Sequence, residues 1–377
     1  MKKACLLLGC VLVLLLLSGP VLAANTAKSL GMAGAVVAIG DDLSAPYFNP
    51  AGLASMKKNC AGLSLSSKSV AWSGDYDASG SRMNLFENLG GAMPLGQGTL
   101  YAGSATLNWF FANVEDPGFG SDVVVDTWLN APGVAYGAML MPGLMVGGGL
   151  NYLMYSSITD QPDTDNNVTY TGTGIGATLG ALYSAAPTVN IGGSLTLLGD
   201  VISTGKAEIA PDVDIDRTNN SLPSMIRIGA AVKPMPGLTV SGQFDVVSRV
   251  NFEQKMETDL GDAVLAIRTD SVVVTRLGVE FLAAEGKVPL WAGISFTPDN
   301  NGTLDHDPLD FNAEYIMFCN GGYVTPNTTT ISLGAGYNEG PFSAGIAAQS
   351  STGTVSIVGG DVTITGIEIL ASGSFVF

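Results

Sequence analysis

The sequence predicts an all-β protein, a 14-stranded antiparallel transmembrane β-barrel with an N-terminal hatch (plug) inside the lumen. Three observations predict it. The chain is 46% hydrophobic and only 13% charged, yet no apolar run beyond residue 23 is long enough for a membrane-spanning helix. Apolar and polar residues alternate with a period of two, which is the pattern of strands. Short and long connections take turns along the chain, as they do in outer-membrane barrels.

The first 23 residues have the features of a secretory signal peptide. Lys2 and Lys3 give a basic start, an apolar stretch runs from Leu6 to Leu17, and small residues precede a cleavage site that we expect after Ala23. Leu8-Gly9-Cys10 resembles a lipid-attachment box, but the apolar run continues past the cysteine. We therefore expect residues 1–23 to be removed as a signal peptide.

The mature chain is strongly acidic. Of 16 basic and 33 acidic residues, cleavage removes two lysines, so the formal charge becomes 14 − 33 = −19. This charge argues against binding of nucleic acid, which needs Lys and Arg to neutralise phosphate. Cys60 and Cys319 would remain, and whether they pair stays open. With one histidine, no metal-ligand cluster and no evident nucleophile–base pair, we expect neither an enzyme nor a cofactor.

Several segments alternate cleanly. Leu238 to Val247 places Leu238, Val240, Phe244 and Val246 against Thr239, Ser241, Gln243 and Asp245. Residues 331–338 and 342–349 repeat the pattern, and so does the end of the chain, where Phe375 and Phe377 share one face. A terminal aromatic on an outward face suits the interfacial girdle of a barrel.

The connections decide between a barrel and a soluble β-sandwich, which would also alternate. Six short ones lie at residues 95–98, 141–144, 185–189, 233–238, 283–289 and 338–342. Seven long acidic ones lie near 73–82, 113–127, 158–167, 203–222, 253–271, 298–328 and 351–362. They join fourteen strands within residues 59–377, and lipid requires such a sheet to close. A sandwich has no reason to sort its turns this way.

Residues 24–58 remain outside the strand count. This segment is too polar and too broken to span a membrane, and too apolar to be an exposed tail. Residues 33–38 are mostly small, and Asn49-Pro50 forces a bend because proline restricts itself and its predecessor. A fourteen-stranded barrel would otherwise be partly hollow. We therefore expect residues 24–58 to fill the lumen.

The same segment resembles the N-terminal hatch of the FadL/TodX family of outer-membrane transporters. The matching positions are Gly31, Met32, Gly34, Asp41-Asp42 and Asn49-Pro50-Ala51-Gly52-Leu53. Residues 221–247 and 276–298 look like strands of the same family. The resemblance covers most of the mature chain.

The resemblance implies passive uptake of hydrophobic small molecules, such as long-chain fatty acids or hydrocarbons, across the outer membrane of a Gram-negative-type bacterium. It also implies lateral release through a gap made by a kink in the third strand, here residues 99–113 with Gly103 as the candidate bulge. We expect the chain to be a monomer. Outer-membrane lipid and lipopolysaccharide are the expected surroundings. Two alternatives stay open: a FadL-like barrel acting as a surface or secretion-machinery platform, and a general porin for small hydrophilic solutes.

Three groups of residues are candidate sites. The hatch or gating group is Asp41, Asp42, Asn49, Pro50, Ala51 and Gly52. Alternation places a second group on inward faces, where buried charges need partners: Arg227, Asp245, Arg276, Glu280 and Glu368. We expect Asp41 and Asp42 to pair with the two arginines of this group. A third group is an apolar cluster in a long loop that could collect ligand: Phe311, Tyr315, Ile316, Met317 and Phe318.

Overall fold

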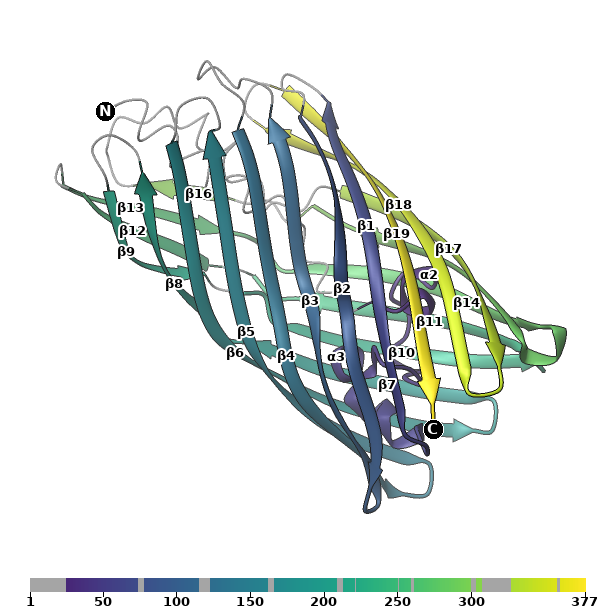
Figure 1. Ribbon diagram of the computed structural model, residues 1–377. Coiled ribbons are helices and arrows are strands. Elements are labelled where there is room, and N and C mark those ends of the chain that lie inside the picture. The colour runs from purple at the N-terminus through teal and green to yellow at the C-terminus, as the bar shows by residue number, and fades with distance from the viewer. Residues whose placement is uncertain are drawn as a thin grey trace.

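The computed structural model describes residues 25–73, 78–114, 123–161, 166–208, 213–220, 222–249, 251–258, 261–299, 303–306, 327–357 and 360–377. Its strands form one closed antiparallel barrel with short helices inside (Figure 1). The helices are α2 Ala27–Gly31, α3 Ala45–Phe48, η1 Pro50–Ser55 and η2 Ala284–Gly286. The strands are β1 Cys60–Ser73, β2 Ala78–Leu95, β3 Gly98–Val114, β4 Val123–Met141, β5 Leu144–Gln161, β6 Asn166–Ala186, β7 Val189–Leu198, β8 Val201–Glu208, β9 Val213–Asn220, β10 Met225–Met235, β11 Leu238–Val247, β12 Asn251–Thr258, β13 Gly261–Arg268, β14 Val272–Ala283, β15 Val288–Thr297, β16 Thr303–His306, β17 Asn327–Glu339, β18 Phe342–Ile357 and β19 Gly360–Val376.

The nineteen strand pieces make fourteen barrel strands. Five barrel strands are each broken into two pieces, namely β7 with β8, β9 with β10, β11 with β12, β13 with β14 and β15 with β16. The pairing shows this, because β6 pairs with both β7 and β8, and β12 pairs with β9 while β11 pairs with β10. Thus 19 − 5 = 14, as predicted. The ring closes where β1 pairs with β19 from Cys60↔Val376 to Ser73↔Thr363.

The alternation puts apolar side chains outside. In β11, Val240 and Phe244 are exposed at 41% and 56%, whereas Ser241 and Gln243 are buried at 0% and 1%. The same contrast recurs around the wall and creates an outer apolar belt, which is what a barrel presents to lipid. Within the part of the chain that the structure describes, no helix has the length and apolar character to cross a membrane.

Glycine fixes five of the six short turns. Gly96, Gly143, Gly237, Gly286 and Gly340 each have a positive φ, between 59° and 90°. This left-handed conformation costs a residue without a Cβ little, so glycine suits tight hairpins. All six short connections lie where the sequence predicts them.

The strands are longer than expected. The alternation suggests strands of about ten residues, but β6 has 21 and β4 has 19. Several predicted loops are partly strand, since β8 continues to Glu208 and β9 begins at Val213 inside the predicted loop 203–222. The backbone ladder needs no apolar face, so hairpins can continue beyond the alternating region.

One interface of the wall lacks its ladder. β2 and β3 pair from Leu95↔Gly98 to Asn88↔Ala105 and again at Ser79↔Asn113, but residues 80–87 and 106–112 have no partners across this interface. Nine residue steps separate Ser79 from Asn88, which is about 30 Å at roughly 3.3 Å per residue. We call this stretch the seam.

Two irregularities lie along the seam. β2 carries extra residues between Asn84 and Asn88 relative to β1, and β3 has a register shift between Thr106 and Asn108 relative to β4. Gly103, the expected bulge, is regularly paired with Gly90 and Gly133, so that expectation is wrong. The space at Gly103 and Gly90 is instead taken by the ring of Tyr101, which leaves no room for a Cβ at either glycine.

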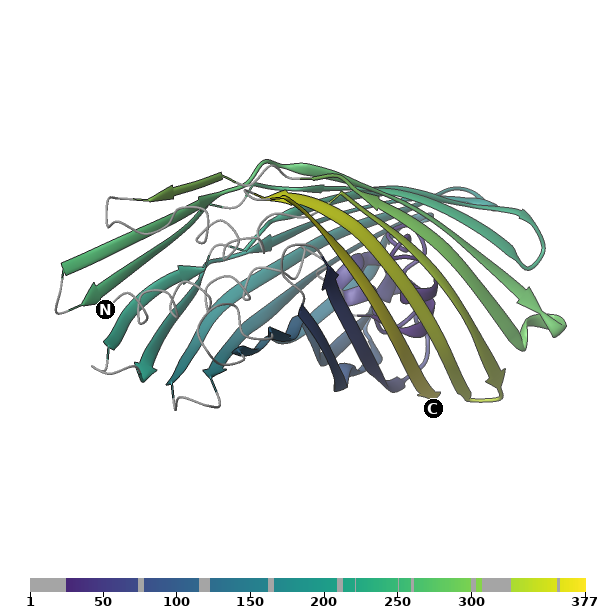
Figure 2. The same cartoon turned by 90° about the horizontal axis from the view of Figure 1, so that it is seen from above.

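Residues 25–58 lie inside the barrel, toward the end with the short turns (Figures 1 and 2). We call them the inner segment. Thr26 caps α2 in a capping box with Ser29. Ala33, Gly34 and Gly40 have positive φ and reverse the chain before α3. Asn49 then caps η1, accepting a hydrogen bond from the Ala51 amide.

Candidate functional site: the inner segment and its seat in the wall

Glycines of the wall form the seat of the inner segment. A Cβ added at any of eight wall glycines would lie less than 3.0 Å from inner-segment atoms. The five with the closest contacts are Gly137 on β4, Gly147 on β5, Gly180 on β6, Gly192 on β7 and Gly293 on β15. The atoms they meet belong mostly to the backbone at Pro50, Val37 and Met32, which cannot move aside as a flexible side chain could. The absence of side chains therefore lets the inner segment sit directly against the wall.

Asn49 joins three parts of this seat. Its Nδ2 donates to the Val37 carbonyl at 2.7 Å and to the Ala181 carbonyl of β6 at 2.9 Å, while its Oδ1 accepts from the Ala51 amide at 3.2 Å. The side chain is fully buried. Gly180, directly before Ala181, provides the space for the amide. One side chain thus connects two stretches of the inner segment to each other and to the wall.

The residues of the predicted gating group that follow Asn49 pack against both the inner segment and the wall. Gly52 lies against Gly40 so closely that a Cβ on Gly52 would overlap the Gly40 backbone. Ala51 is buried in a cluster with Val37, Ala38, Leu182 and Ala231. Pro50 rests on Gly137 and Gly147. These contacts explain why small residues stand at the positions of the family motif.

The inward arginines bind backbone of the inner segment. Arg276 on β14 pairs with Asp245 on β11, Nε to Oδ2 at 2.7 Å, and its Nη1 donates to the Ala33 carbonyl at 2.9 Å. Arg227 on β10 donates through Nη1 to the Tyr47 carbonyl at 3.3 Å and lies 5.4 Å from the ring centre of Phe48.

Asp41 and Asp42 have other partners than the arginines, so that part of the expectation is wrong. Asp41 pairs with Lys28 at 2.9 Å. Asp42 accepts hydrogen bonds from the hydroxyls of Thr26 and Ser44 and from the Ser44 amide. The ion pair between inner segment and wall is instead Lys28 with Glu280 on β14, at 3.0 Å, and Trp291 donates to the same carboxylate.

Two predicted groups do not join this site. Glu368 on β19 is buried and accepts a hydrogen bond from Gln349 at 2.7 Å. The proposed loop cluster Phe311, Tyr315, Ile316, Met317 and Phe318 lies outside the described residues, as does Cys319. Cys60 is a free thiol.

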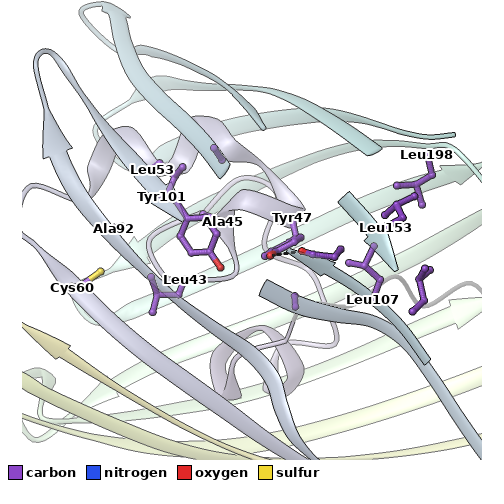
Figure 3. Close-up of a cluster of buried hydrophobic side chains, with 14 of the residues drawn as sticks. Leu43, Ala45, Tyr47, Leu53, Cys60, Ala92, Tyr101, Leu107, Leu153 and Leu198 are labelled. Carbon is purple, nitrogen blue, oxygen red and sulfur yellow. Dashed lines mark hydrogen bonds between the residues drawn. The ribbon is translucent and has the colours of Figure 1, made fainter. Parts of the chain in front are cut away.

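An apolar cluster runs from the inner segment along one side of the lumen (Figure 3). Near the inner segment, Tyr47 and Tyr101 meet edge to face at 6.2 Å between ring centres. Beyond them the cluster continues over β3, β4, β5, β7 and β8 with the buried residues Leu107, Leu129, Leu153, Leu198 and Val201. In Figure 3 it extends from Cys60 at one end to Leu198 at the other. This side of the lumen is therefore apolar.

A cavity of about 420 Å³ adjoins the Cys60 end of this apolar cluster, near the short turns, and shares Leu43 and Cys60 with it. Its lining includes Lys28, Asp41, Asp42, Glu280 and Trp291, together with small residues of β18, β19 and β1. The apolar cluster therefore meets, at its Cys60 end, a cavity whose lining carries several charged groups.

The ion pair between Lys28 and Asp41 predicts that the stability of the seated inner segment depends on pH. Burial acts to raise the pKa of Asp41. The charge of the Lys28 ammonium and its hydrogen bond to Asp41 together outweigh this effect, so the pKa lies below the ordinary 3.8. The ion pair thus stabilises the seated inner segment at pH values above 3.8. This stabilisation is lost as the pH falls through the lowered pKa of Asp41. Burial and the Asp41 charge raise the pKa of Asp42, so its contribution has the opposite sign and is lost as pH rises.

We expect protease cleavage within residues 25–58 to increase below about pH 3.8, measured with an acid-active protease on the detergent-solubilised barrel. Asp41→Asn should be cleaved faster than the parent at neutral pH and should lose this part of the acid response. The contribution of Asp42 becomes smaller in Asp41→Asn, because loss of the Asp41 charge removes one cause of the raised Asp42 pKa. Equal acid profiles for the two proteins would contradict the role of the Lys28–Asp41 pair.

Sequence reasoning missed three contributors to the site. Lys28 is one, and Gln243 is another, because its Oε1 accepts from the Val37 amide at 2.9 Å while its Nε2 donates to Asp245. The third is the glycine seat. Its signal was present, since all five of the seat glycines named above stand within six residues of a short turn (137 before 141, 147 after 144, 180 before 186, 192 after 189, 293 after 288).

This geometry defines a class of protein, an outer-membrane-type β-barrel whose lumen holds its own N-terminal segment. Solved structures share the fold. The Pseudomonas putida toluene transporter TodX aligns with a TM-score of 0.72 at 14% identity, covering 94% of this chain and 99% of that one. The Ralstonia pickettii toluene transporter TbuX gives 0.69 at 15% identity over 96% and 99%.

A Pseudomonas aeruginosa FadL homologue gives a TM-score of 0.66 at 11% identity over 95% and 98%. The resemblance to FadL/TodX is thus confirmed for the fold, over nearly the whole chain. No family model matches the sequence, and no curated protein matches it either. At these identities the structures establish the architecture and leave the cargo to be inferred from the site.

Proposed function

We propose that the chain is an outer-membrane channel for the passive uptake of hydrophobic small molecules, and that residues 24–58 are the hatch that closes it. The observation that carries this proposal is the apolar cluster along β3, β4, β5, β7 and β8. Porin lumens are polar and hold water. A row of buried leucines facing the lumen would hinder hydrophilic solutes, whereas it lowers the free energy of an apolar one.

Hydrocarbons and fatty acids are the cargo classes that we infer. The neighbours with the same fold are described as a toluene transporter or a monoaromatic hydrocarbon channel, and one is a FadL homologue. The chain would act as a monomer in the outer membrane, surrounded by lipid and lipopolysaccharide, and would catalyse no reaction. The exposed outer belt fits lipid and argues against a soluble secreted β-protein.

Cargo would leave sideways through the seam between β2 and β3. An apolar molecule gains by passing into lipid, whereas release into the aqueous periplasm would cost its burial energy. The seam is the place in the wall where backbone pairing is missing over the longest described stretch. The apolar cluster reaches its edge, because Ala105 and Leu107 stand where the pairing of β3 with β2 ends.

Uptake of toluene and of glucose tests the proposal. Cells that express the chain and lack other hydrocarbon channels should accumulate labelled toluene at least about tenfold faster than cells without it, with glucose uptake unchanged. Mass spectrometry of the protein purified in mild detergent should find apolar molecules bound. Rapid glucose entry and a large open-channel conductance would favour the general porin. A stable protein partner with no bound apolar molecule would favour the platform.

A further inference from the structure

Side chains bridge the seam where backbone hydrogen bonds do not. At the end of the seam nearer the short turns, the Thr106 hydroxyl lies 3.1 Å from the Phe86 carbonyl of β2 and 2.9 Å from Asn130 Oδ1 of β4. At the end of the seam nearer the long loops, Arg82 of β2 forms an ion pair with Asp126 of β4, two strands away. The Arg82 guanidinium also lies over the ring of Trp128, 5.3 Å from its centre.

The two members of this ion pair belong to opposite faces of the wall. Arg82 is in register with Lys68 and shares its strand face with the buried Asn84, so it starts from the lumen side. Asp126 is in register with the exposed Ile158 and shares its face with the exposed Val134, so it stands on the lipid side. A side chain can join the two faces only where the wall is open, and the seam is such a place.

We propose that Arg82 is the gate residue of the seam: its side chain passes between β2 and β3 and holds the seam closed by binding Asp126. This inference rests on the lateral release proposed above and assigns its control to one ion pair. A charge facing lipid is costly without a partner, which favours the closed pair at rest. Arg82 and Asp126 keep 38% and 19% of their side-chain surface exposed, so neighbouring side chains do not enclose the pair and it can separate when cargo arrives.

The gate makes the seam a barrier that cargo opens from within. An apolar molecule moving along the cluster from Leu153 to Leu107 arrives at the lumen side of the seam. Displacing the Arg82 side chain into the aqueous lumen opens a path and returns the guanidinium to water, where its charge is solvated. When the cargo has left, the Asp126 carboxylate draws the guanidinium back.

Spin-label distances test the gate without any cargo. Labels on cysteines at Met83 and Ile158, both on the outer face, would report the separation of β2 and β5 across the seam in lipid nanodiscs, with Cys60 and Cys319 changed to serine. Arg82→Gln and Asp126→Asn should each lengthen or broaden this distance. The double exchange of Arg82→Asp with Asp126→Arg should restore it. Lys287→Gln is the control, because it removes the exposed Lys287–Glu339 pair far from the seam.

A second readout separates the gate from the function on which it rests. Whole-cell uptake of the uncharged aromatic dye N-phenylnaphthylamine should rise at least about threefold in both single variants. Longer distances with unchanged dye uptake would support the gate and count against lateral release as the transport route. Unchanged distances in both single variants, or longer distances that the double exchange does not restore, would overturn the proposal.

Discussion

Asn49→Ala is expected to release the inner segment from the wall and to open the channel to ions. The change leaves the carbonyls of Val37 and Ala181 and the amide of Ala51 without their buried partner. An orphaned buried group costs about 1–3 kcal/mol, so the loss of three partners should destabilise the seated state by roughly 3–9 kcal/mol. Since 1.4 kcal/mol changes an equilibrium tenfold, the unseated population rises by at least about a hundredfold. Single-channel recording in planar bilayers should show long open intervals that the parent lacks.

The matched control is Asn338→Ala. Asn338 donates one hydrogen bond of 3.2 Å to the Gly286 carbonyl at the short-turn end, away from the Asn49 seat. This variant should keep the parent's conductance and its resistance to proteolysis of residues 25–58. Asn49→Ala with a closed, protease-resistant channel would show that the amide does not hold the inner segment.

Gly192→Ala is expected to have a comparable effect by a steric route. The new methyl group would lie within 3.0 Å of the Val37 carbonyl oxygen and the Ala38 Cα. Backbone on both sides of this contact cannot rotate away, and overpacking of this kind costs about 1–3 kcal/mol or more. We expect proteolysis of residues 25–58 to accelerate at least tenfold, with higher conductance and an intact barrel.

The neighbouring Gly193→Ala separates this effect from strand propensity. Gly193 lies on the outer face of the same strand, and a methyl group there would be 3.6 Å from the nearest atom, the Arg227 carbonyl oxygen. Both variants change the same residue type in the same strand, so a general effect of alanine on β7 appears equally in both. If Gly193→Ala loosened the inner segment as much as Gly192→Ala, the seat would not be the cause.

The sequence predicts the number and order of the strands because, in a barrel built of hairpins, each strand and each turn is determined by residues close together in the chain. Each strand alternates, and five of six short turns carry a glycine with positive φ. The lengths were underestimated, since ladders such as Asn167↔Glu208 in the β6–β8 pair continue without an apolar face. The sequence could not locate the seam, because the seam arises from shifts in pairing register between neighbouring strands. A single glycine such as Gly103 suggests only a bulge within its own strand.

The sequence predicts which residues belong to the site better than it predicts their contacts. Alternation identifies Arg227, Arg276 and Glu280 as inward residues, and the structure buries or half-buries all three. Their partners depend on how residues 25–58 turn at Gly34 and Gly40, which no periodicity describes. Those reversals bring Lys28 to Asp41, thirteen residues along the chain, and so give Asp41 a partner closer than any arginine.

The pairing of β1 with β19 sets the order in which the molecule can be assembled. The strand that follows the inner segment must wait for the last strand to be made before the ring is complete. Until then the inner segment has an open trough around it, and the contact of the Ala27 amide with the Ser372 hydroxyl of β19 cannot form. The ring is therefore complete around residues 25–58 only when its first and last strands have paired. A chain that ended before β19 would leave β1 without this partner and the sheet with two unpaired edges.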